Sequence, residues 1–367
     1  MIDEVSFNVS DMLVWCKRVR RHAGEHVVRF ELAAGQPSAT VFDREQWCEA
    51  RTPFVDIPQL GNPNTHWFAP IDLLIDALSA ASAVKDAGGT LTVDHDENML
   101  RFVGGGVTAS LPLMAEQAWW APPKRCDGKV GATLGQLAAV MGFARDEAIN
   151  LELAVVRCEH DAIVATDLQR IGWIETTTQL GPDDHVSVPA ASVKLADTFL
   201  PPEAEVWMGD GAWSAEWRGD RFVGTPVMAQ FPNWRSVVDK MVPDNPEVAG
   251  RRPFMVSRRD LGRALKDLSS KSFDPVVAVH LRFINNDTLV VSRRALEGGS
   301  VDIEMVLPEP FEGEDLTLTF QCAVLGASLR AWKSDAVMMW AGGPLEPTMW
   351  WSSDDLKFIQ TPVKELK

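Results

Sequence analysis

The stretch RFVGTPVMAQFPNWRSVV, residues 221–238, begins with an apolar segment that ends in Gly-Thr-Pro. The same phrase returns near the end of the chain, where residues 358–363 read FIQTPV, and a weaker form, FVGGGV, occupies residues 102–107. Apolar residues followed by a Gly- or Pro-bearing turn are typical of a buried strand and a chain reversal. A phrase written three times at wide spacing indicates an internal repeat.

An amphipathic segment of helical length precedes each phrase at a similar distance. These segments are FAPIDLLIDALSAA from Phe68, VPAASVKLADTFL from Val188 and FQCAVLGASLRAW from Phe320. Two of them carry an early proline, Pro70 and Pro189, which we expect in the first helical turn, where a missing N–H is tolerated.

A second helix is predicted further upstream of each phrase, from apolar residues at positions i, i+3, i+4 and i+7. The three sets are Met12, Trp15, Cys16 and Val19; Leu134, Leu137, Ala138 and Met141; and Leu261, Ala264, Leu265 and Leu268.

The chain is therefore predicted to be α+β, with three tandem repeats at residues 1–122, 126–244 and 252–367. Pro- and Gly-bearing segments near 121–129 and 242–253 separate them. Each repeat holds two helices packed on antiparallel strands. The alternative is three unrelated α+β domains, but the same landmarks in the same order favour a repeat.

Composition sets further bounds. The chain has 367 residues, of which 46% are hydrophobic and 23% charged, as in an ordinary globular protein. No apolar run of about 18 residues and no signal-peptide pattern is present, which predicts a cytoplasmic protein without a membrane partner. The five cysteines are scattered and form no CxxC pair, which predicts reduced thiols and no zinc site.

The net charge of −16 argues against a nucleic-acid partner unless the basic residues are segregated. They gather on the polar faces of the predicted helices. For any single helix a solvated surface is the alternative, but the recurrence favours a surface that faces DNA phosphates. No base-reading motif accompanies them, so binding to double-stranded DNA should be independent of sequence. The predicted DNA-facing residues are Lys17, Arg18, Arg20, Arg21, Arg145, Lys194, Arg258, Arg259, Arg263, Lys266, Arg330 and Lys333.

Motifs for catalysis are weak. Two acidic clusters with histidine, residues 94–97 (DHDE) and 183–185 (DDH), read as solvated turns because neither has partners at metal-ligand spacing. The VGGGV segment lacks the Lys-Ser/Thr of a phosphate loop, and no GxSxG is present. We predict no catalytic residues, no metal and no cofactor. An enzyme that uses residues 94–97 with a bound metal is the remaining alternative.

Three segments resemble a known family. ATDLQRIG (165–172) resembles the ATD-x-H-R-L segment of the bacterial DNA polymerase III β subunit, the DNA sliding clamp. AQFPNWRSVV (229–238) is similar to its R-F-P-[DE]-[YF]-R-x-[VL] segment, and TPVKEL (361–366) to its M-P-[ML]-R-[LI] ending. The resemblance spans the chain and is weaker over residues 1–125.

The resemblance implies three clamp units per chain and a head-to-tail homodimer that closes into a ring. Helices would line the bore around duplex DNA, and each repeated phrase would be an outer-sheet strand that closes one unit. The implied function is that of a non-enzymatic processivity factor that tethers the replicative polymerase. The alternative is a clamp-like scaffold that binds peptides without stably encircling DNA. Lys271 lies where the family's subunit interface is expected to be apolar.

The resemblance also implies a pocket for short apolar peptides of polymerases and clamp loaders. Without the resemblance, its apolar residues would read as core packing. Leu168 stands where the family has a small residue, and Thr361 and Val363 replace two adaptable methionines, which predicts a narrower range of peptides. The implied pocket residues are Ile149, Thr166, Leu168, Arg170, Ile171, Pro232, Val237, Pro344, Thr361, Pro362 and Val363.

Overall fold

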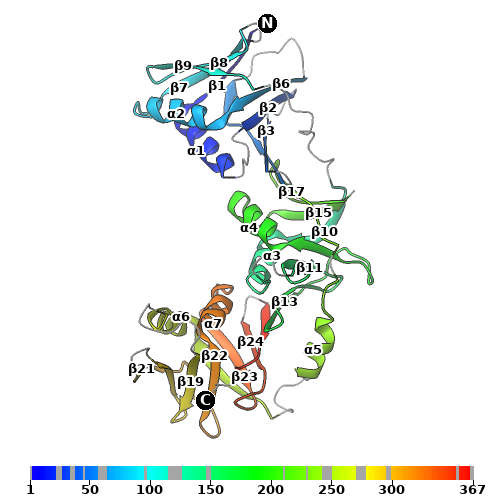
Figure 1. Cartoon of the computed structure of the whole chain (residues 1–367), viewed down its shortest axis with the longest axis vertical. Coiled ribbons are helices and arrows are strands. Elements are labelled where there is room, and N and C mark those ends of the chain that lie inside the picture. Colours follow the sequence, from blue (N-terminus) through cyan, green and yellow to red (C-terminus); the bar gives the residue numbers. More distant parts are fainter. Residues whose placement is uncertain are drawn as a thin grey trace. The chain divides into compact units, whose positions relative to one another are not determined.

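The computed structural model describes residues 2–21, 27–33, 38–43, 46–56, 64–94, 97–114, 126–145, 150–209, 211–228, 230–241, 250–269, 278–294, 299–352 and 355–363. The chain divides into two compact units, and Figure 1 labels many of their elements. The first consists of Met1–Gly135 and Ser192–Pro226, and the second of Gln136–Ala191 and Val227–Lys367.

The first compact unit holds two antiparallel sheets. The five-stranded sheet has the order β5 (Phe54–Asp56), β1 (Ile2–Asn8), β7 (Gly88–Asp94), β8 (Met99–Gly104) and β9 (Val107–Pro112). The eight-stranded sheet has the order β10 (Gly128–Thr133), β15 (Glu205–Gly209), β16 (Ala212–Trp217), β17 (Asp220–Gly224), β4 (Gln46–Arg51), β3 (Ser38–Asp43), β2 (Val27–Ala33) and β6 (Asn64–Pro70).

The second compact unit also holds an eight-stranded and a smaller antiparallel sheet. The larger has the order β14 (Val186–Pro189), β11 (Val155–Cys158), β12 (Ala162–Thr166), β13 (Arg170–Glu175), β25 (Leu356–Gln360), β24 (Thr348–Ser352), β23 (Ala336–Ala341) and β18 (Arg252–Ser257). The four-stranded sheet has the order β21 (Ser300–Val306), β20 (Thr288–Arg294), β19 (Ala278–Ile284) and β22 (Leu316–Gln321).

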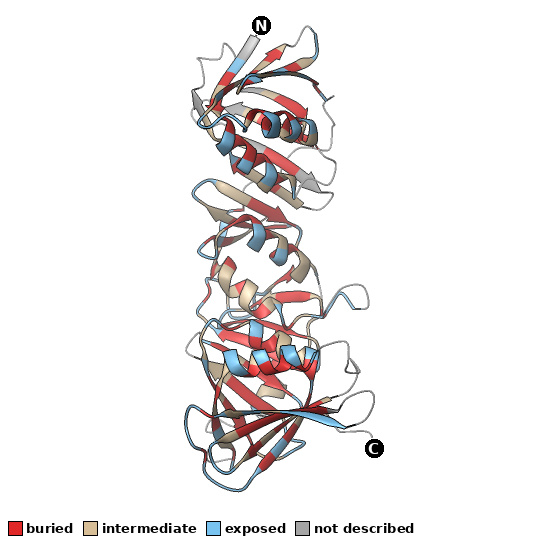
Figure 2. Ribbon diagram, turned by 90° about the vertical axis from the view of Figure 1, so that its left-hand side faces the viewer, coloured by how far each residue is buried: buried red, intermediate tan, exposed pale blue. Residues whose placement is uncertain are grey.

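Seven helices occur in the described part of the chain. Each buries one face, and all except α3 also carry exposed residues on the other, as the colours of Figure 2 indicate. Within the units, α1 packs against α2 and α6 against α7. Six of the helices confirm the predicted amphipathic segments. The helices are α1 (Val9–Arg20), α2 (Ile71–Ala81), α3 (Leu134–Met141), α4 (Ala190–Phe199), α5 (Trp234–Met241), α6 (Arg258–Asp267) and α7 (Cys322–Arg330).

Details of three predicted helices were wrong. Pro70 is the N-cap of α2, with an extended backbone (φ −71°, ψ 109°), and Pro189 is the last residue of β14. Both therefore precede their helices, because the strand runs directly into the first turn. In α3, Val140 is fully buried, whereas Ala138 and Met141 are half-buried.

Helix α5 was not predicted, although its sequence lies in the stretch that opened the analysis. The Asn233 side chain accepts a hydrogen bond from the Ser236 backbone N–H at 3.3 Å, which is the N-cap arrangement that favours a helix start. Trp234 is buried against the sheet, so packing stabilises a helix of only eight residues.

The repeated phrase marks the strands that join predicted repeats. Strand β17 pairs with β4, so that Phe222 lies opposite Cys48, and β25 pairs with β13, so that Phe358 lies opposite Gly172. The weaker copy at 102–107 does not fit this pattern. Its Phe102 lies on β8, which is enclosed between β7 and β9 in the five-stranded sheet, so the expectation that it closes a unit is wrong. The strand at the end of this sheet is β9, not β8, which carries Phe102.

Each eight-stranded sheet thus combines strands from two predicted repeats. Strands β2, β3, β4 and β6 fall within residues 1–122, whereas the other four strands of their sheet fall within 126–244. The division into two compact units therefore does not follow the three predicted repeats, and the bounds of the repeats stay a prediction. The connecting segments 115–125 and 242–249 lie outside the described residues.

An aromatic core underlies the β13–β25 pairing. The Phe358 ring stacks on Trp332 at a centroid distance of 4.8 Å and lies 5.2 Å from Phe143. Gly172 leaves the space that the Phe143 ring occupies, because a Cβ at this position would overlap that ring. The apolar strand and the glycine opposite it are therefore one packing arrangement.

No disulfide links the five cysteines, all of which lie in the described part of the chain and are buried. Burial raises the pKa of the Cys158 thiol to about 12 and raises the pKa of Cys16 above its ordinary range. Such thiols stay protonated at neutral pH, as is typical of structural cysteines. Among the described residues, no helix has both the length and the apolar content needed to cross a membrane.

Replacing Gly172 with alanine should destabilise the second compact unit, because the new methyl group overlaps the Phe143 ring. Overpacking of this kind lowers the free energy of unfolding by about 3 kcal/mol. Gly262, inside α6, is the matched control, since a Cβ there meets nothing within 4 Å and alanine favours a helix. Calorimetry should show a lower Tm for Gly172→Ala and an unchanged or higher Tm for Gly262→Ala. Equal Tm values for both variants would contradict this packing.

Candidate functional site

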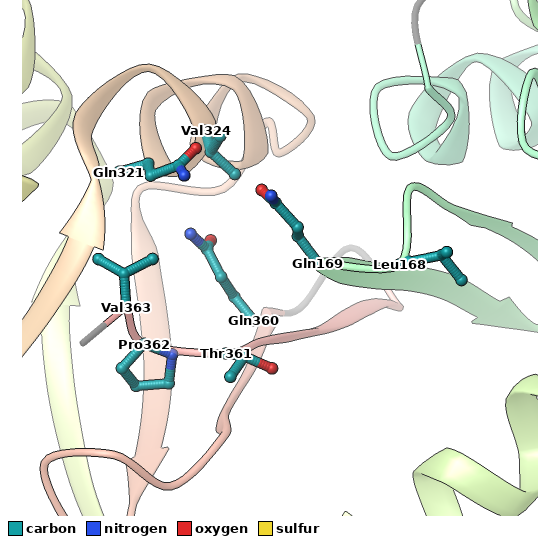
Figure 3. Close-up of a pocket in the computed structure, with 8 residues that line it drawn as sticks. All are labelled: Leu168, Gln169, Gln321, Val324, Gln360, Thr361, Pro362 and Val363. Carbon is teal, nitrogen blue, oxygen red and sulfur yellow. The ribbon is translucent and has the colours of Figure 1, made fainter. Parts of the chain in front are cut away.

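A hollow of about 260 Å³ lies in the second compact unit, where the β12–β13 turn, the start of α7 and the end of β25 meet. We call it the β25 pocket (Figure 3). Four of its lining residues, Leu168, Thr361, Pro362 and Val363, are among the predicted pocket residues. The other four, Gln169, Gln321, Val324 and Gln360, are not.

The chain after β25 is held on both sides of the pocket. The Thr361 backbone N–H donates to the carbonyl of Gln169 at 3.4 Å, and the Val363 N–H donates to the carbonyl of Thr319, on β22, at 2.8 Å. The Thr361–Val363 segment therefore bridges the β12–β13 turn and the smaller sheet, and this bridge forms one wall of the pocket.

Thr166 shapes the turn that borders the pocket. Its hydroxyl donates to the carbonyl of Arg170 at 2.7 Å and accepts from the Leu168 N–H at 3.1 Å. Asp167 Oδ1 accepts from the N–H groups of Gln169 and Arg170 at 2.9 and 2.7 Å. These bonds hold Leu168 in the left-handed region, with φ of 71°. Its side chain is 67% exposed and points away from the other lining side chains in Figure 3.

Arg170 ties this turn to α7. Its guanidinium donates to Asp167 Oδ2 through Nε and Nη2, at 2.9 and 2.7 Å. Nη1 donates to the Ser328 hydroxyl at 3.1 Å and to the carbonyl of Val324 at 3.3 Å. Arg170 is only 6% exposed. Its charge-assisted hydrogen bonds to Asp167, Ser328 and Val324 hold the β12–β13 turn against α7 and thereby position the wall of the pocket.

Ile171 and Val237, two other predicted pocket residues, belong to an apolar cluster beneath α5. The buried members are Ala162, Val164, Ile171, Trp173, Trp234 and Ile359, with Phe231, Val237 and Val238 packed against them. Pro232 precedes the helix, and its carbonyl accepts from the Trp234 N–H at 2.8 Å. These residues fix α5 on the sheet and do not line the β25 pocket.

Pro344 is exposed in the loop between β23 and β24 and is not a lining residue of the pocket. Ile149 lies outside the described residues. Pro344 was predicted to line the pocket only because of the family resemblance. Gln321 and Val324 line the pocket but were not predicted, because they lie at the junction of β22 and α7, outside the segments that carry the resemblance.

A second hollow, of about 470 Å³, is polar and includes the 183–185 cluster. Its charges are partly neutralised, since Arg235 pairs with Glu159 at 3.0 Å and with Asp161, and Arg157 pairs with Glu159 at 3.0 Å. Within the described residues, no group of three or more His, Cys, Asp or Glu side chains is arranged to hold a metal ion. The arrangement anchors the start of α5 through ion pairs.

Asp94 and Glu97, the described residues of the 94–97 cluster, lie between two paired strands, as a hairpin turn predicts. Strand β7 ends at Asp94 and β8 begins at Met99, and Asp94 Oδ1 accepts from the Glu97 N–H at 3.0 Å. Residues 95 and 96 lie outside the described residues.

The predicted DNA-facing residues fall into two groups. Arg18 pairs with Asp220 at 2.9 Å, Arg20 pairs with Asp72, and Arg258 Nε donates to the carbonyl of Ser334 at 2.8 Å, so these three stabilise their own unit. The other residues are exposed, either on helices or within four residues after a helix end. They are Lys17, Arg21, Arg145, Lys194, Arg259, Arg263, Lys266, Arg330 and Lys333.

Replacing Leu168 with asparagine should stabilise the chain. A left-handed backbone costs a leucine about 1 kcal/mol, whereas asparagine adopts it readily, and little apolar burial is lost at an exposed site. The free energy of unfolding should rise by about 0.5–1 kcal/mol. Leu345→Asn is the control, because Leu345 is also exposed but lacks a positive φ. Urea unfolding would compare the two variants, and a loss of stability at position 168 alone would show that the leucine has a packing role.

No protein-family model matches the sequence, and no curated protein matches it. Solved structures do match. The DnaN sliding clamp of Pseudomonas aeruginosa bound to griselimycin has a TM-score of 0.78 at 16% identity, covering 99% of this chain and 100% of the clamp. The sliding clamp of Bacillus subtilis has a TM-score of 0.79 at 12% identity and covers 100% of both chains.

The β clamp of Helicobacter pylori, solved with a DNA ligase peptide, has a TM-score of 0.79 at 12% identity over 99% of this chain and 100% of that one. These identities are low, but the structural match covers 99% or more of this chain in each case and the whole of each clamp. The chain therefore has the fold of the bacterial DNA polymerase III β subunit.

Proposed function

We propose that this chain is a DNA sliding clamp that encircles duplex DNA as a head-to-tail homodimer and tethers a replicative polymerase. The observation that carries the proposal is the full-length likeness to the clamps of three bacteria. In this role the protein is a cytoplasmic processivity factor that binds its partners and catalyses no reaction. The division into three clamp units, at 1–122, 126–244 and 252–367, is part of the same proposal.

Exposed cations on the helices support a DNA-binding role. In a chain of net charge −16, the exposed faces of α1 and α6 carry Lys17, Arg21, Arg259, Arg263 and Lys266. Positive charge on equivalent helices attracts phosphates without reading bases, and exposed side chains make contacts that exchange quickly. A clamp needs such loose contacts, because tight ones would stop it from sliding.

The β25 pocket supports the second binding role. Its aliphatic residues Val324, Pro362 and Val363 offer an apolar wall, and its polar residues can orient a bound peptide. The H. pylori clamp was solved with a DNA ligase peptide. By analogy, apolar peptides of a polymerase and a clamp loader are the ligands that we propose for this pocket.

Two sheet edges support a head-to-tail dimer. Strand β9 ends the five-stranded sheet and β21 ends the four-stranded sheet, and neither has a further partner strand among the described residues. On β21, Val301 and Val306 are exposed, the latter by 77%. An open edge with exposed apolar residues invites pairing with another chain. Pairing β9 of one copy with β21 of the next uses two different surfaces, which is the geometry that builds rings. Lys271 lies outside the described residues.

Light scattering over a dilution series, at low and moderate salt, tests the ring. We expect a mass of two chains that persists on dilution. Replacing both Val301 and Val306 with lysine should reduce the mass to one chain without lowering the Tm, because charged side chains block edge pairing at exposed positions. Val84→Lys, at an exposed turn position, is the control and should leave the dimer intact. A wild-type monomer at micromolar concentration would overturn the stable ring and favour the peptide-binding scaffold.

Charge reversal tests the DNA surface. Arg263→Glu, on α6, should weaken binding of a labelled duplex and reduce the slope of log affinity against log salt by about 1. Arg101→Glu changes the net charge equally but lies on the exposed face of β8. Fluorescence anisotropy at low salt measures both variants. Equal losses for the two would show that overall charge, not the helix surface, governs binding.

A further inference from the structure

One side chain in the β25 pocket is buried and not fully used by the chain itself. Gln360 is 2% exposed but lines the pocket. Its carboxamide oxygen accepts from the Ser328 hydroxyl at 3.4 Å, and its backbone carbonyl accepts from Thr348 Oγ1 at 3.0 Å. Its carboxamide nitrogen makes no hydrogen bond to any described residue.

A hydrogen-bond network lies on the oxygen side of the Gln360 carboxamide. Arg170 Nη1 donates to the Ser328 oxygen, so the hydroxyl hydrogen of Ser328 must point to another acceptor. The two acceptors within reach are the carbonyl of Val324 and the Gln360 carboxamide oxygen. In the structure the carboxamide oxygen of Gln360 lies on the α7 side, 3.4 Å from the Ser328 hydroxyl, which leaves its NH₂ group on the pocket side. Arg170 and Ser328 are thus positioning residues for Gln360.

The neighbours of Gln360 make the pocket neutral and rich in amides. In Figure 3 the side chains of Gln169, Gln321 and Gln360 extend toward one another from three different elements. Gln321 is the N-cap residue of α7, but its side chain makes no cap hydrogen bond. None of the eight lining residues carries a charge. Among these lining residues a carboxylate ligand would find no opposing cation, so an uncharged acceptor suits the pocket better.

We propose that Gln360 donates a hydrogen bond to a neutral carbonyl oxygen of the bound peptide and selects peptides that place an acceptor at this point. The inference rests on the peptide-binding role proposed above. Water in the empty pocket can accept from this donor. A ligand that displaces the water and supplies an acceptor replaces the lost hydrogen bond, whereas a ligand without an acceptor leaves the donor unpaired. The carbonyl can come from the peptide backbone or from an amide side chain.

The test uses a fluorescein-labelled DNA ligase peptide of the kind bound by the H. pylori clamp, with fluorescence anisotropy on the full chain. Gln360→Met keeps the length of the side chain and removes the donor, and should weaken binding about tenfold. Gln360→Glu keeps the shape and replaces the donor with an acceptor, and should weaken it further. Gln179→Met, at an exposed glutamine of the same unit that does not line the pocket, is the control and should change affinity by less than about twofold. The Tm of each variant checks folding.

A scan of the ligand separates a direct contact from a structural effect. One arm replaces each backbone amide in turn with an alkene, and the other replaces each amide side chain with an aliphatic one. At one position the wild-type chain should lose about tenfold in affinity and Gln360→Met should lose nothing, and the arm in which this occurs identifies the carbonyl. If no position shows this coupling, Gln360 is not the donor, although the pocket still binds peptide. If the wild-type chain binds none of the peptides, the proposed peptide role fails and this inference fails with it.

Discussion

The antiparallel pairing of β13 with β25 is the constraint on which the rest of the second compact unit depends. It joins Arg170–Ile174 to Leu356–Gln360, two segments far apart in the sequence. Phe358 can lie against Phe143 only because the residue opposite it is Gly172. The pairing is therefore fixed by side-chain volume as well as by backbone hydrogen bonds. The β17–β4 pairing has the corresponding place in the first unit, where Arg221 also binds Glu49 at 2.9 Å.

The β25 pocket follows from this pairing. Arg170 and Gln360 are opposite each other in the register, so the turn that precedes β13 and the segment that follows β25 leave the sheet at the same end. Arg170 then binds α7 through Ser328, and Ser328 binds Gln360. A single buried network thus links the turn, the helix and the terminal segment. A peptide bound there would contact all three, and its affinity would depend on how rigidly they are held together.

Much of the architecture could be predicted from the sequence. Apolar periodicity located six helices, because a helix repeats its buried face every three or four residues whatever it packs against. The short α5 was not predicted. Its Asn233 cap alone does not stabilise eight residues, and the helix also needs the sheet that buries Trp234. The copy of the phrase at Phe102 was misleading for a similar reason. An apolar strand followed by glycines reads the same in an enclosed strand as in one that joins two repeats.

The sequence by itself determined the α+β class, the repeated helix and strand pattern and the segregation of positive charge. These are local or compositional properties, and each is encoded within a short window of the chain. Only the tertiary structure decided that Arg170 is buried and hydrogen-bonds the β12–β13 turn to α7, and that Ile171 and Val237 pack beneath α5. It also decided that Gln169, Gln321 and Gln360 line the same pocket. Their meeting depends on the register between distant strands, which no local pattern encodes, because hydrogen bonds between strands are made by backbone groups common to every residue.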